Sequence, residues 1–182
     1  MHAASDRELA LQVRRGEDEA FGELVRRYQT SVFNVCYRML GERREAEDFT
    51  QEAFIRAYDR FDSFNVKRPF GPWIQRIAAN LCLNSMQRVS PPHFHLEEER
   101  DLPLERPARN PEALAEQGEL AEQVRQAILD LPGHYRTVIE LRHFQDMNYD
   151  EIAQALGLSL SEVKTHLYRA RRALADRLSP DD

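Results

Sequence analysis

The sequence predicts an all-α protein made of two small helical domains. Apolar residues recur at intervals of three and four over residues 5–88 and 111–174, as on the buried face of a helix, and no stretch alternates as a half-buried strand does. Residues 90–110 contain four of the nine prolines, clustered charges and no apolar period. We therefore expect an N-terminal helical bundle over 1–89, a proline-rich acidic linker over 90–110 and a second helical domain over 111–182.

The helices of the first domain have recognisable ends. Ser5 and Glu8 have the spacing of a capping box, which starts a short helix, and Gly41 suits the end of a long helix over 20–40. A third helix is expected over 43–61 and a fourth over 73–88. Residues 62–72 between them are expected to form a loop, because the segment contains two prolines and a glycine.

The second domain ends in a helix-turn-helix. Asn148 and Glu151 form one expected capping box, Gly157 suits the end of that short helix, and Ser159 and Glu162 form a second box two residues later. Earlier helices are expected from a cap at 110–112 to residue 131, and over 134–144. Two capping boxes around a tight turn favour a helix-turn-helix over a plain αα-hairpin with a solvated basic face.

The last helix carries a face suited to the DNA major groove. Leu160, Val163, Leu167, Ala170 and Leu174 are expected to face the core. The opposite face mixes hydrogen-bond donors, an aromatic ring and cations, which read base edges and hold phosphates. The candidate residues for duplex DNA are Lys164, Thr165, His166, Tyr168, Arg169, Arg171 and Arg172.

A second candidate surface, for single-stranded DNA, lies in the first domain. Aromatic rings and cations are interleaved in the loop over 62–72, and the following helix carries an amide-rich face, so bases could stack on the rings and bond to the amides. The candidates are Phe64, Lys67, Arg68, Asn80, Asn84, Gln87 and Arg88. The alternative is that Phe64, Phe70 and Trp73 only close a helical core.

The distribution of charge indicates a protein that needs a larger partner to bind DNA. The net charge of −6 divides into +1 over residues 1–90, −5 over 91–120 and −2 over 121–182. Residues 161–177 hold five cations against two acids. Because affinity from counterion release scales with the number of phosphates neutralised, we expect weak binding to DNA by the chain alone.

Other function classes have no support in the sequence. It contains no glycine-rich phosphate loop or nucleophile elbow, so we expect no enzyme activity and no cofactor. His93 and His95 lack further ligands nearby and predict no metal site, and Cys36 and Cys82 are expected to be buried free thiols. No apolar run reaches the ~18 residues of a membrane span, and no secretory signal is evident, so we expect a cytoplasmic protein.

The two halves together resemble a bacterial RNA polymerase sigma factor of the extracytoplasmic-function (ECF) type. Residues 46–58, AEDFTQEAFIRAY, are similar to the core-polymerase-binding helix of that family, and residues 72–84, PWIQRIAANLCLN, to its promoter-melting helix. Residues 129–174 are similar throughout to its helix-turn-helix domain. The resemblance covers nearly the whole chain.

The resemblance implies a role for each surface. Glu47, Asp48, Gln51 and Glu52 would dock on the clamp helices of core RNA polymerase, and a carboxylate-rich face suits a basic partner. The loop and the fourth helix would capture the non-template strand of the downstream promoter box, while the last helix would read the upstream box as duplex. Glu162 could serve as a cap or as a base contact. An anti-sigma factor is a further expected partner.

The length of the linker is compatible with two promoter contacts. Residues 89–110 extend to at most roughly 75 Å at ~3.4 Å each, while two sites two helical turns apart are separated by about 70 Å. Two alternatives differ from a sigma factor: a stand-alone helix-turn-helix regulator, in which residues 46–58 have no role, and a sigma mimic that sequesters an anti-sigma factor.

Overall fold

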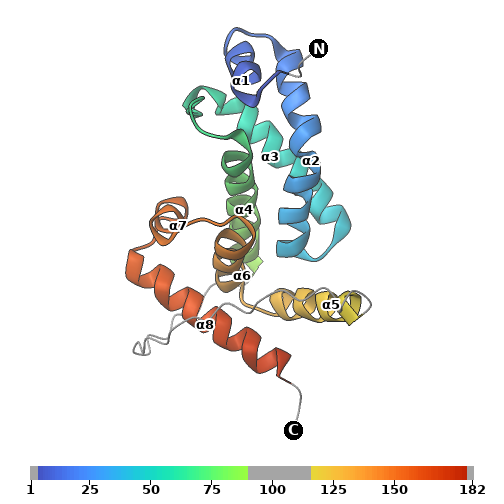
Figure 1. Ribbon diagram of the computed structural model, residues 1–182, viewed down its shortest axis with the longest axis vertical. Helices are drawn as coiled ribbons and strands as arrows, with labels where there is room; N and C mark the ends of the chain where they lie inside the picture. Colours follow the sequence, from blue (N-terminus) through green and yellow to red (C-terminus); the bar gives the residue numbers. More distant parts are fainter. Residues whose placement is uncertain (1–3, 90–115, 180–182) are drawn as a thin grey trace.

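The computed structural model describes residues 4–89 and 116–179, and every regular element within these ranges is helical. The N-terminal unit contains α1 (Asp6–Arg14), α2 (Asp18–Leu40), α3 (Arg43–Asp59), the 3-10 turn η1 (Phe61–Ser63) and α4 (Phe70–Val89). Helices α2, α3 and α4 pack side by side, with α1 across one end of the bundle (Figure 1). The expected N-terminal helical bundle is confirmed.

The C-terminal unit is also helical. Its elements are α5 (Glu116–Leu129), α6 (Gly133–Ile139), the π-helical turn η3 (Glu140–Phe144), α7 (Tyr149–Leu156) and α8 (Leu160–Leu178). Helices α5, α6 and α7 all pack against α8. The expected linker and the expected helix start at 110–112 lie outside the described residues.

Helix ends in the N-terminal bundle follow local chemistry. The hydroxyl of Ser5 accepts the Glu8 N–H at 3.3 Å, and the Glu8 carboxylate accepts the Ser5 N–H at 2.7 Å, which completes the expected capping box of α1. Gly41 ends α2 with φ of 78°, a left-handed conformation that glycine adopts without steric cost. Both predictions are confirmed.

Helix α4 starts earlier than the sequence suggested, at Phe70 instead of Trp73. Gly71 and Pro72 fall in its first turn, where the backbone N–H groups need no intrahelical partner, so neither residue breaks the helix. A Cβ atom on Gly71 would lie 2.7 Å from Cε1 of Tyr28, so any larger residue would have to displace the Tyr28 ring.

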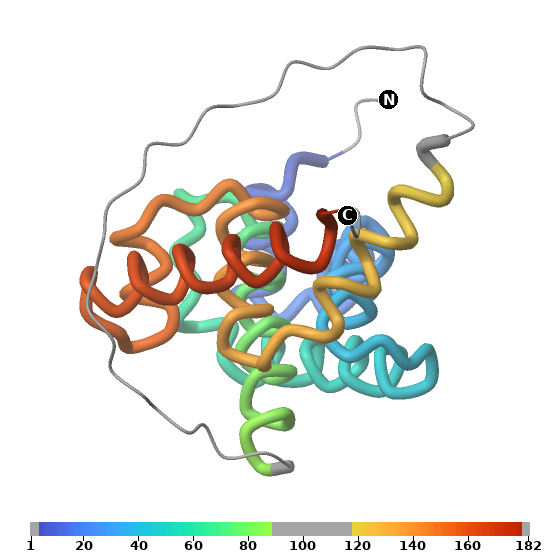
Figure 2. The backbone as a smooth tube through the Cα atoms, turned by 90° about the horizontal axis from the view of Figure 1, so that it is seen from below, coloured from blue at the N-terminus to red at the C-terminus, as the bar shows by residue number. Residues whose placement is uncertain are grey.

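The two units share one continuous apolar core. Phe70, Leu24 and Ile74 are fully buried in the bundle, and Leu141 and Leu167 in the C-terminal unit. Helix α4 packs against α6 and α7, and the C-terminal end of α2 against α5, α6 and η3 (Figures 1 and 2). No helix in the described ranges is long and apolar enough to cross a membrane.

Candidate nucleic-acid interface

The helix-turn-helix is built by two capping boxes, as expected. Asn148 Oδ1 accepts the Glu151 N–H at 2.9 Å, and the Glu151 carboxylate accepts the Asn148 N–H at 2.8 Å. Ser159 and Glu162 repeat this exchange at 3.2 and 2.7 Å, and Gly157 between the helices has φ of 67°. The carboxylate of Glu162 is thus engaged as a cap in the free chain.

The buried face of α8 is broader than expected: Val163, Leu167 and Ala170 are buried as predicted, and His166 is buried beside them. His166 is only 7% exposed, whereas Leu160, expected in the core, is 41% exposed. The ring of His166 packs on those of His134 and Tyr135 in α6, with centroids 5.1 and 5.8 Å apart. The expectation that His166 lies on the exposed face was wrong, because the aromatic surface of α6 covers it.

The remaining candidates on α8 are accessible. Lys164 and Arg172 are exposed, and Thr165, Tyr168 and Arg169 are half-buried. Arg171 is also half-buried, and its Nε donates to Nε2 of His143 at 3.3 Å. The structure therefore brings cations and short polar side chains together along one helix, as a major-groove reader requires.

Two histidines at the contact between α6 and α8, His134 and His166, are neutral at neutral pH. Burial, together with the neighbouring His166 and Arg169, lowers the pKa of His134 to about 4. Burial also lowers the pKa of His166. The positive charge of α8 at neutral pH therefore comes from its lysine and arginines.

The aromatic residues of the expected single-strand loop form a packed cluster. Phe64 is 2% exposed, and its ring centroid lies 4.8 Å from that of Trp73 and 5.6 Å from that of Phe70. Phe61 packs against all three rings. The expectation that Phe64 is available for stacking on bases was wrong, and the alternative, that these rings close the helical core, is confirmed for Phe64 and Phe70.

The same cluster positions the cations of the loop. Lys67 and Arg68 are exposed, and Asn65 Oδ1 accepts the Lys67 N–H at 3.0 Å. Arg14 of α1 donates from Nη2 to the carbonyl oxygens of Phe64 at 2.6 Å and Asp62 at 3.2 Å. Sequence reasoning missed Arg14, because nothing near it in the chain indicates a contact with a loop 50 residues away.

The amide-rich face of α4 is separate from the loop. Asn80, Asn84, Gln87 and Arg88 follow one helical stripe, and the last three are exposed. Asn80 is half-buried, and its Nδ2 donates to the carbonyl oxygen of Ala155 in α7 at 3.2 Å. Asn84 lies about 21 Å along the helix from Phe70, at 1.5 Å per residue. The candidates thus form two groups, at opposite ends of α4.

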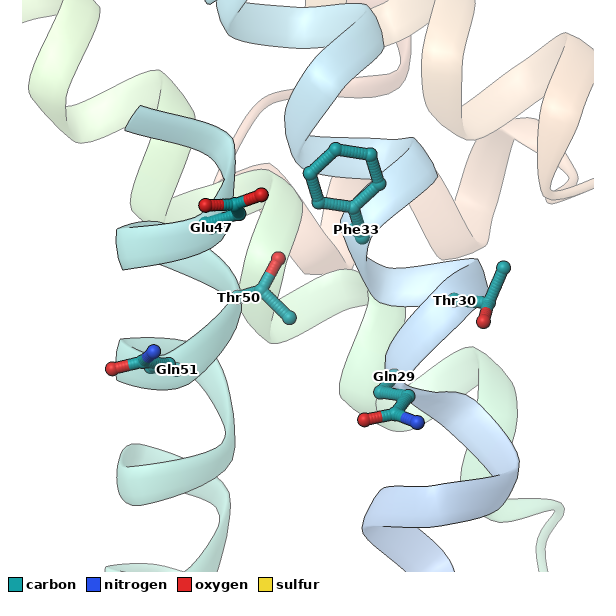
Figure 3. A pocket seen from close by; sticks show the side chains of 6 residues that line it. All are labelled: Gln29, Thr30, Phe33, Glu47, Thr50 and Gln51. Atoms are coloured by element: carbon teal, nitrogen blue, oxygen red, sulfur yellow. The ribbon is translucent and has the colours of Figure 1, made fainter. Parts of the chain in front are cut away.

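A polar groove lies between α2 and α3. Glu47, Thr50 and Gln51 of α3 face the groove from one side, and Gln29, Thr30 and Phe33 of α2 line the other (Figure 3). Asp48 is exposed on α3, and Glu52 is half-buried. The sequence indicated the α3 residues, but the contribution of α2 was missed because its exposed polar positions carry no distinguishing pattern.

Two carboxylates on α3 already have partners within their own helix. Arg43 Nε lies 3.0 Å from Glu47 Oε1, and Arg56 Nε lies 2.7 Å from Glu52 Oε1. Exposed pairs of this kind contribute at most about 1 kcal/mol. Glu47 and Glu52 can therefore exchange these arginines for a basic partner at little cost.

The described residues hold no group of three or more side chains that could bind a metal ion. His93 and His95 lie outside these residues. Cys36 and Cys82 are free and fully buried, as expected.

Comparison with known families places both units. The model "Sigma-70 region 2" matches residues 24–90, and "Sigma-70, region 4" matches residues 121–174. The chain is 38% identical to the ECF RNA polymerase sigma factor SigW of Bacillus subtilis, over 92% of this chain and 93% of SigW. The chain belongs to the ECF RNA polymerase sigma factors. It is an alternative sigma factor that directs RNA polymerase to promoters.

Further relatives agree with this assignment. The ECF RNA polymerase sigma-E factor of Escherichia coli strain K12 is 32% identical, over 97% of this chain and 95% of that protein. The structure of CnrH in complex with the cytosolic domain of CnrY has a TM-score of 0.65 and 29% identity, covering 97% of this sigma factor and 99% of CnrH. The sigma factor RpoE of Bartonella quintana, solved with the anti-sigma factor NepR, shares the fold at a TM-score of 0.61, 19% identity and coverage of 89% and 98%. A stand-alone regulator would leave the region 2 match without a role.

Proposed function

We propose that this sigma factor divides initiation among three of its surfaces. Residues 1–89 would bind core polymerase and the downstream box, and residues 111–182 would read the upstream box. The observation that carries the proposal is that the exposed stripe of α4 falls in the region 2 match and the cationic face of α8 in the region 4 match.

The groove between α2 and α3 is the proposed docking surface for the clamp helices of core polymerase. Glu47 and Gln51 line the groove, and Asp48 and Glu52 follow them on α3. These four residues would supply carboxylates and an amide, joined by the α2 residues across the groove. An acidic rim suits a basic partner and would speed association. Because polymerase is cytoplasmic, we place the chain in the cytoplasm.

The promoter would be held at two places. Lys67, Arg68, Asn80, Asn84, Gln87 and Arg88 would capture and help melt the downstream box. Lys164, Thr165, Tyr168, Arg169, Arg171 and Arg172 would read the upstream box as duplex. Amides bond to the edges of unstacked bases, whereas arginine and lysine bond to guanine edges and phosphates in the major groove.

Run-off transcription with purified core polymerase on a randomised promoter library tests this proposal. We expect transcripts that depend on the sigma factor, and weak binding of the selected promoters by the sigma factor alone. Tight binding alone without transcripts would contradict the proposal. Replacing Asn84 and Gln87 by alanine should abolish promoter melting, measured by permanganate reactivity, whereas Gln123→Ala on α5 is the matched control.

An anti-sigma factor is a further proposed partner. The support is the shared fold with RpoE, which was solved together with the anti-sigma factor NepR. Affinity purification of the tagged chain from its source bacterium, followed by a transcription assay with the captured protein, tests this: a partner that blocks run-off transcription is expected, and a captured set without inhibitory activity would contradict it.

A further inference from the structure

The short helix α1 lies beside the α3–α4 loop (residues 60–69), which carries Lys67 and Arg68. Figure 1 shows both at the same end of the bundle. The region 2 model matches residues 24–90, so α1 lies before the part of the chain that this model describes. The contacts of α1 with both ends of the loop indicate a role for this helix.

Helix α1 is fixed firmly on α2. Leu9 and Val13 of α1 are buried in the core of the bundle. The Asp6 carboxylate accepts hydrogen bonds from the hydroxyl of Tyr28 and, at 3.0 Å, from Nη1 of Arg27. Burial and the bond to Asp6 raise the pKa of Tyr28 to about 12, so its hydroxyl stays protonated at neutral pH and continues to donate. Helix α1 is therefore a rigid support.

Arg14, the last residue of α1, holds the start of the loop. Its Nη2 donates to the carbonyl oxygen of Phe64 at 2.6 Å and to that of Asp62 at 3.2 Å. Carbonyl groups at the end of a helical turn, here η1, have no partner further along that turn. A charged donor also makes a stronger hydrogen bond than a neutral one. Arg14 thus fixes the backbone three residues before Lys67.

Tyr28 connects α1 to the other end of the loop. Its ring centroid lies 5.3 Å from that of Phe70, the first residue of α4, and the ring lies against the backbone at Gly71. The hydroxyl of the same side chain is held by Asp6. Asp6 and Arg14 are separated by ~12 Å along α1 at 1.5 Å per residue. Helix α1 therefore holds the start of the loop directly and its end through Tyr28.

Between these two ends the loop backbone is folded on itself. The Phe64 N–H donates to the carbonyl oxygen of Phe61 at 3.0 Å, and the Arg68 N–H to that of Asn65 at 2.9 Å. Asn65 Oδ1 accepts the Lys67 N–H at 3.0 Å. The side chains of Lys67 and Arg68 are nevertheless exposed. Contacts made by such a loop are most effective when its backbone is ordered before the ligand binds.

We propose that α1 braces the α3–α4 loop, and that Arg14 is a positioning residue for downstream-box capture. Arg14 holds the loop backbone so that Lys67 and Arg68 meet the unstacked DNA strand in a fixed geometry. The effect on promoter capture rests on the proposed function of this loop, whereas the ordering of the loop by Arg14 does not.

Hydrogen exchange of the free chain tests the brace. Arg14→Gln removes the charged donor, so we expect the amides of Phe64, Lys67 and Arg68 to exchange about threefold to tenfold faster than in the wild type. Arg14→Lys keeps a cation and should recover part of this protection. Arg15→Gln is the matched control, because Arg15 is exposed and makes no side-chain hydrogen bond to the loop within the described residues. Unchanged exchange in Arg14→Gln would overturn the brace.

Promoter melting by the assembled holoenzyme tests the positioning role. On a promoter selected from the randomised library, we expect Arg14→Gln to slow melting about threefold to tenfold, measured by permanganate reactivity. Affinity for core polymerase should stay within about twofold of the wild-type value, because Arg14 shares no contact with the groove between α2 and α3. Since Arg14 acts through the loop cations, its substitution should add little in a Lys67→Ala/Arg68→Ala background.

Three further results separate this proposal from others. Additive losses in the Lys67→Ala/Arg68→Ala background, with a weaker salt dependence of promoter binding in Arg14→Gln, would make Arg14 a phosphate contact and overturn the positioning role. Faster loop exchange with wild-type melting would overturn the link to promoter capture. A wild-type holoenzyme that gives no transcripts would instead contradict the proposed function and leave the exchange result standing.

Discussion

The two proposed DNA-binding surfaces are built in different ways. On α8 the candidate side chains lie on one helix, and that helix starts from a capping box within the segment itself. In the N-terminal unit the candidates fall into two groups, a loop held by Arg14 and a stripe at the far end of α4, and Asn80 in that stripe is covered by α7.

The two surfaces also differ in which unit covers their half-buried residues. On α8, Lys164 and Arg172 are exposed, and Thr165, Tyr168 and Arg169 are half-buried against other elements of their own unit. On α4, Asn84, Gln87 and Arg88 are exposed, whereas Asn80 is half-buried and donates to Ala155 of α7. We therefore expect the stripe on α4, rather than the face of α8, to gain accessible area when the two units separate.

The largest expected effect is a loss of folding stability when the aromatic cluster that holds the loop is disrupted. Phe64→Ala should lower the free energy of unfolding by about 3–5 kcal/mol, because it removes a buried ring from a packed aromatic cluster. Lys67→Ala should change stability by less than about 0.5 kcal/mol, since its side chain is exposed, but it should slow promoter melting. Urea unfolding followed by Trp73 fluorescence measures the first quantity. Equal destabilisation by both variants would contradict this division between core and contact residues.

Docking on polymerase gives the next effect. Asp48→Arg should weaken binding to core polymerase by about 3 kcal/mol, since like charges facing each other across an interface cost several kcal/mol. Glu119→Arg on α5 makes the same change at an exposed residue outside the groove, and should leave the affinity near its wild-type value. Fluorescence anisotropy with labelled sigma factor measures both. If Asp48→Arg keeps the wild-type circular dichroism spectrum and binds core polymerase normally, the docking surface proposed on α3 would be wrong.

The upstream reader gives a smaller effect that depends on base identity. Arg169→Ala should cost ~1–3 kcal/mol at one position of the upstream box if the guanidinium reads a base. Binding to a panel of single-base promoter variants by the sigma factor with polymerase measures this. A uniform loss over the panel would make Arg169 a phosphate contact instead.

The smallest expected effect is a pH dependence of the free energy of unfolding, caused by His134, which packs against His166 of α8. The pKa of His134 is lowered to about 4 from its ordinary value of 6.5, so the unfolded chain takes up a proton between these values before the folded chain does. Stability is therefore highest above pH 6.5 and falls as pH falls toward 4, by about 1 kcal/mol or less at pH 5.5. His134→Phe should flatten this decline, measured by urea unfolding at pH 7.5 and 5.5. An unchanged slope would exclude His134 as its source.

How far the sequence predicts the structure depends on the distance between interacting residues. The three capping boxes and Gly41 and Gly157 were predicted correctly, because each depends on residues within a few positions. The predicted start of α4 was wrong by three residues. Gly71 and Pro72 lie in the first turn, where backbone N–H groups need no intrahelical partner, so they do not prevent the helix from starting at Phe70.

The failures at the candidate site have one cause in common. The burial of His166 depends on rings in α6, and the pairing of Glu140 depends on Arg38, which is 102 positions away in the chain. Helical periodicity indicates that a face is apolar, but it carries no information about which other element covers a polar residue. The role of Arg14 was missed for the same reason.

Energy transfer between dyes on the two units tests the central claim most directly. Asn34→Cys on α2 and Gln154→Cys on α7 place labels at exposed positions, while Cys36 and Cys82 are fully buried. We predict high transfer in the free chain and a loss of transfer when the promoter complex forms with core polymerase. Transfer in the melted promoter complex as high as in the free chain would contradict the account, because α7 would then still cover Asn80.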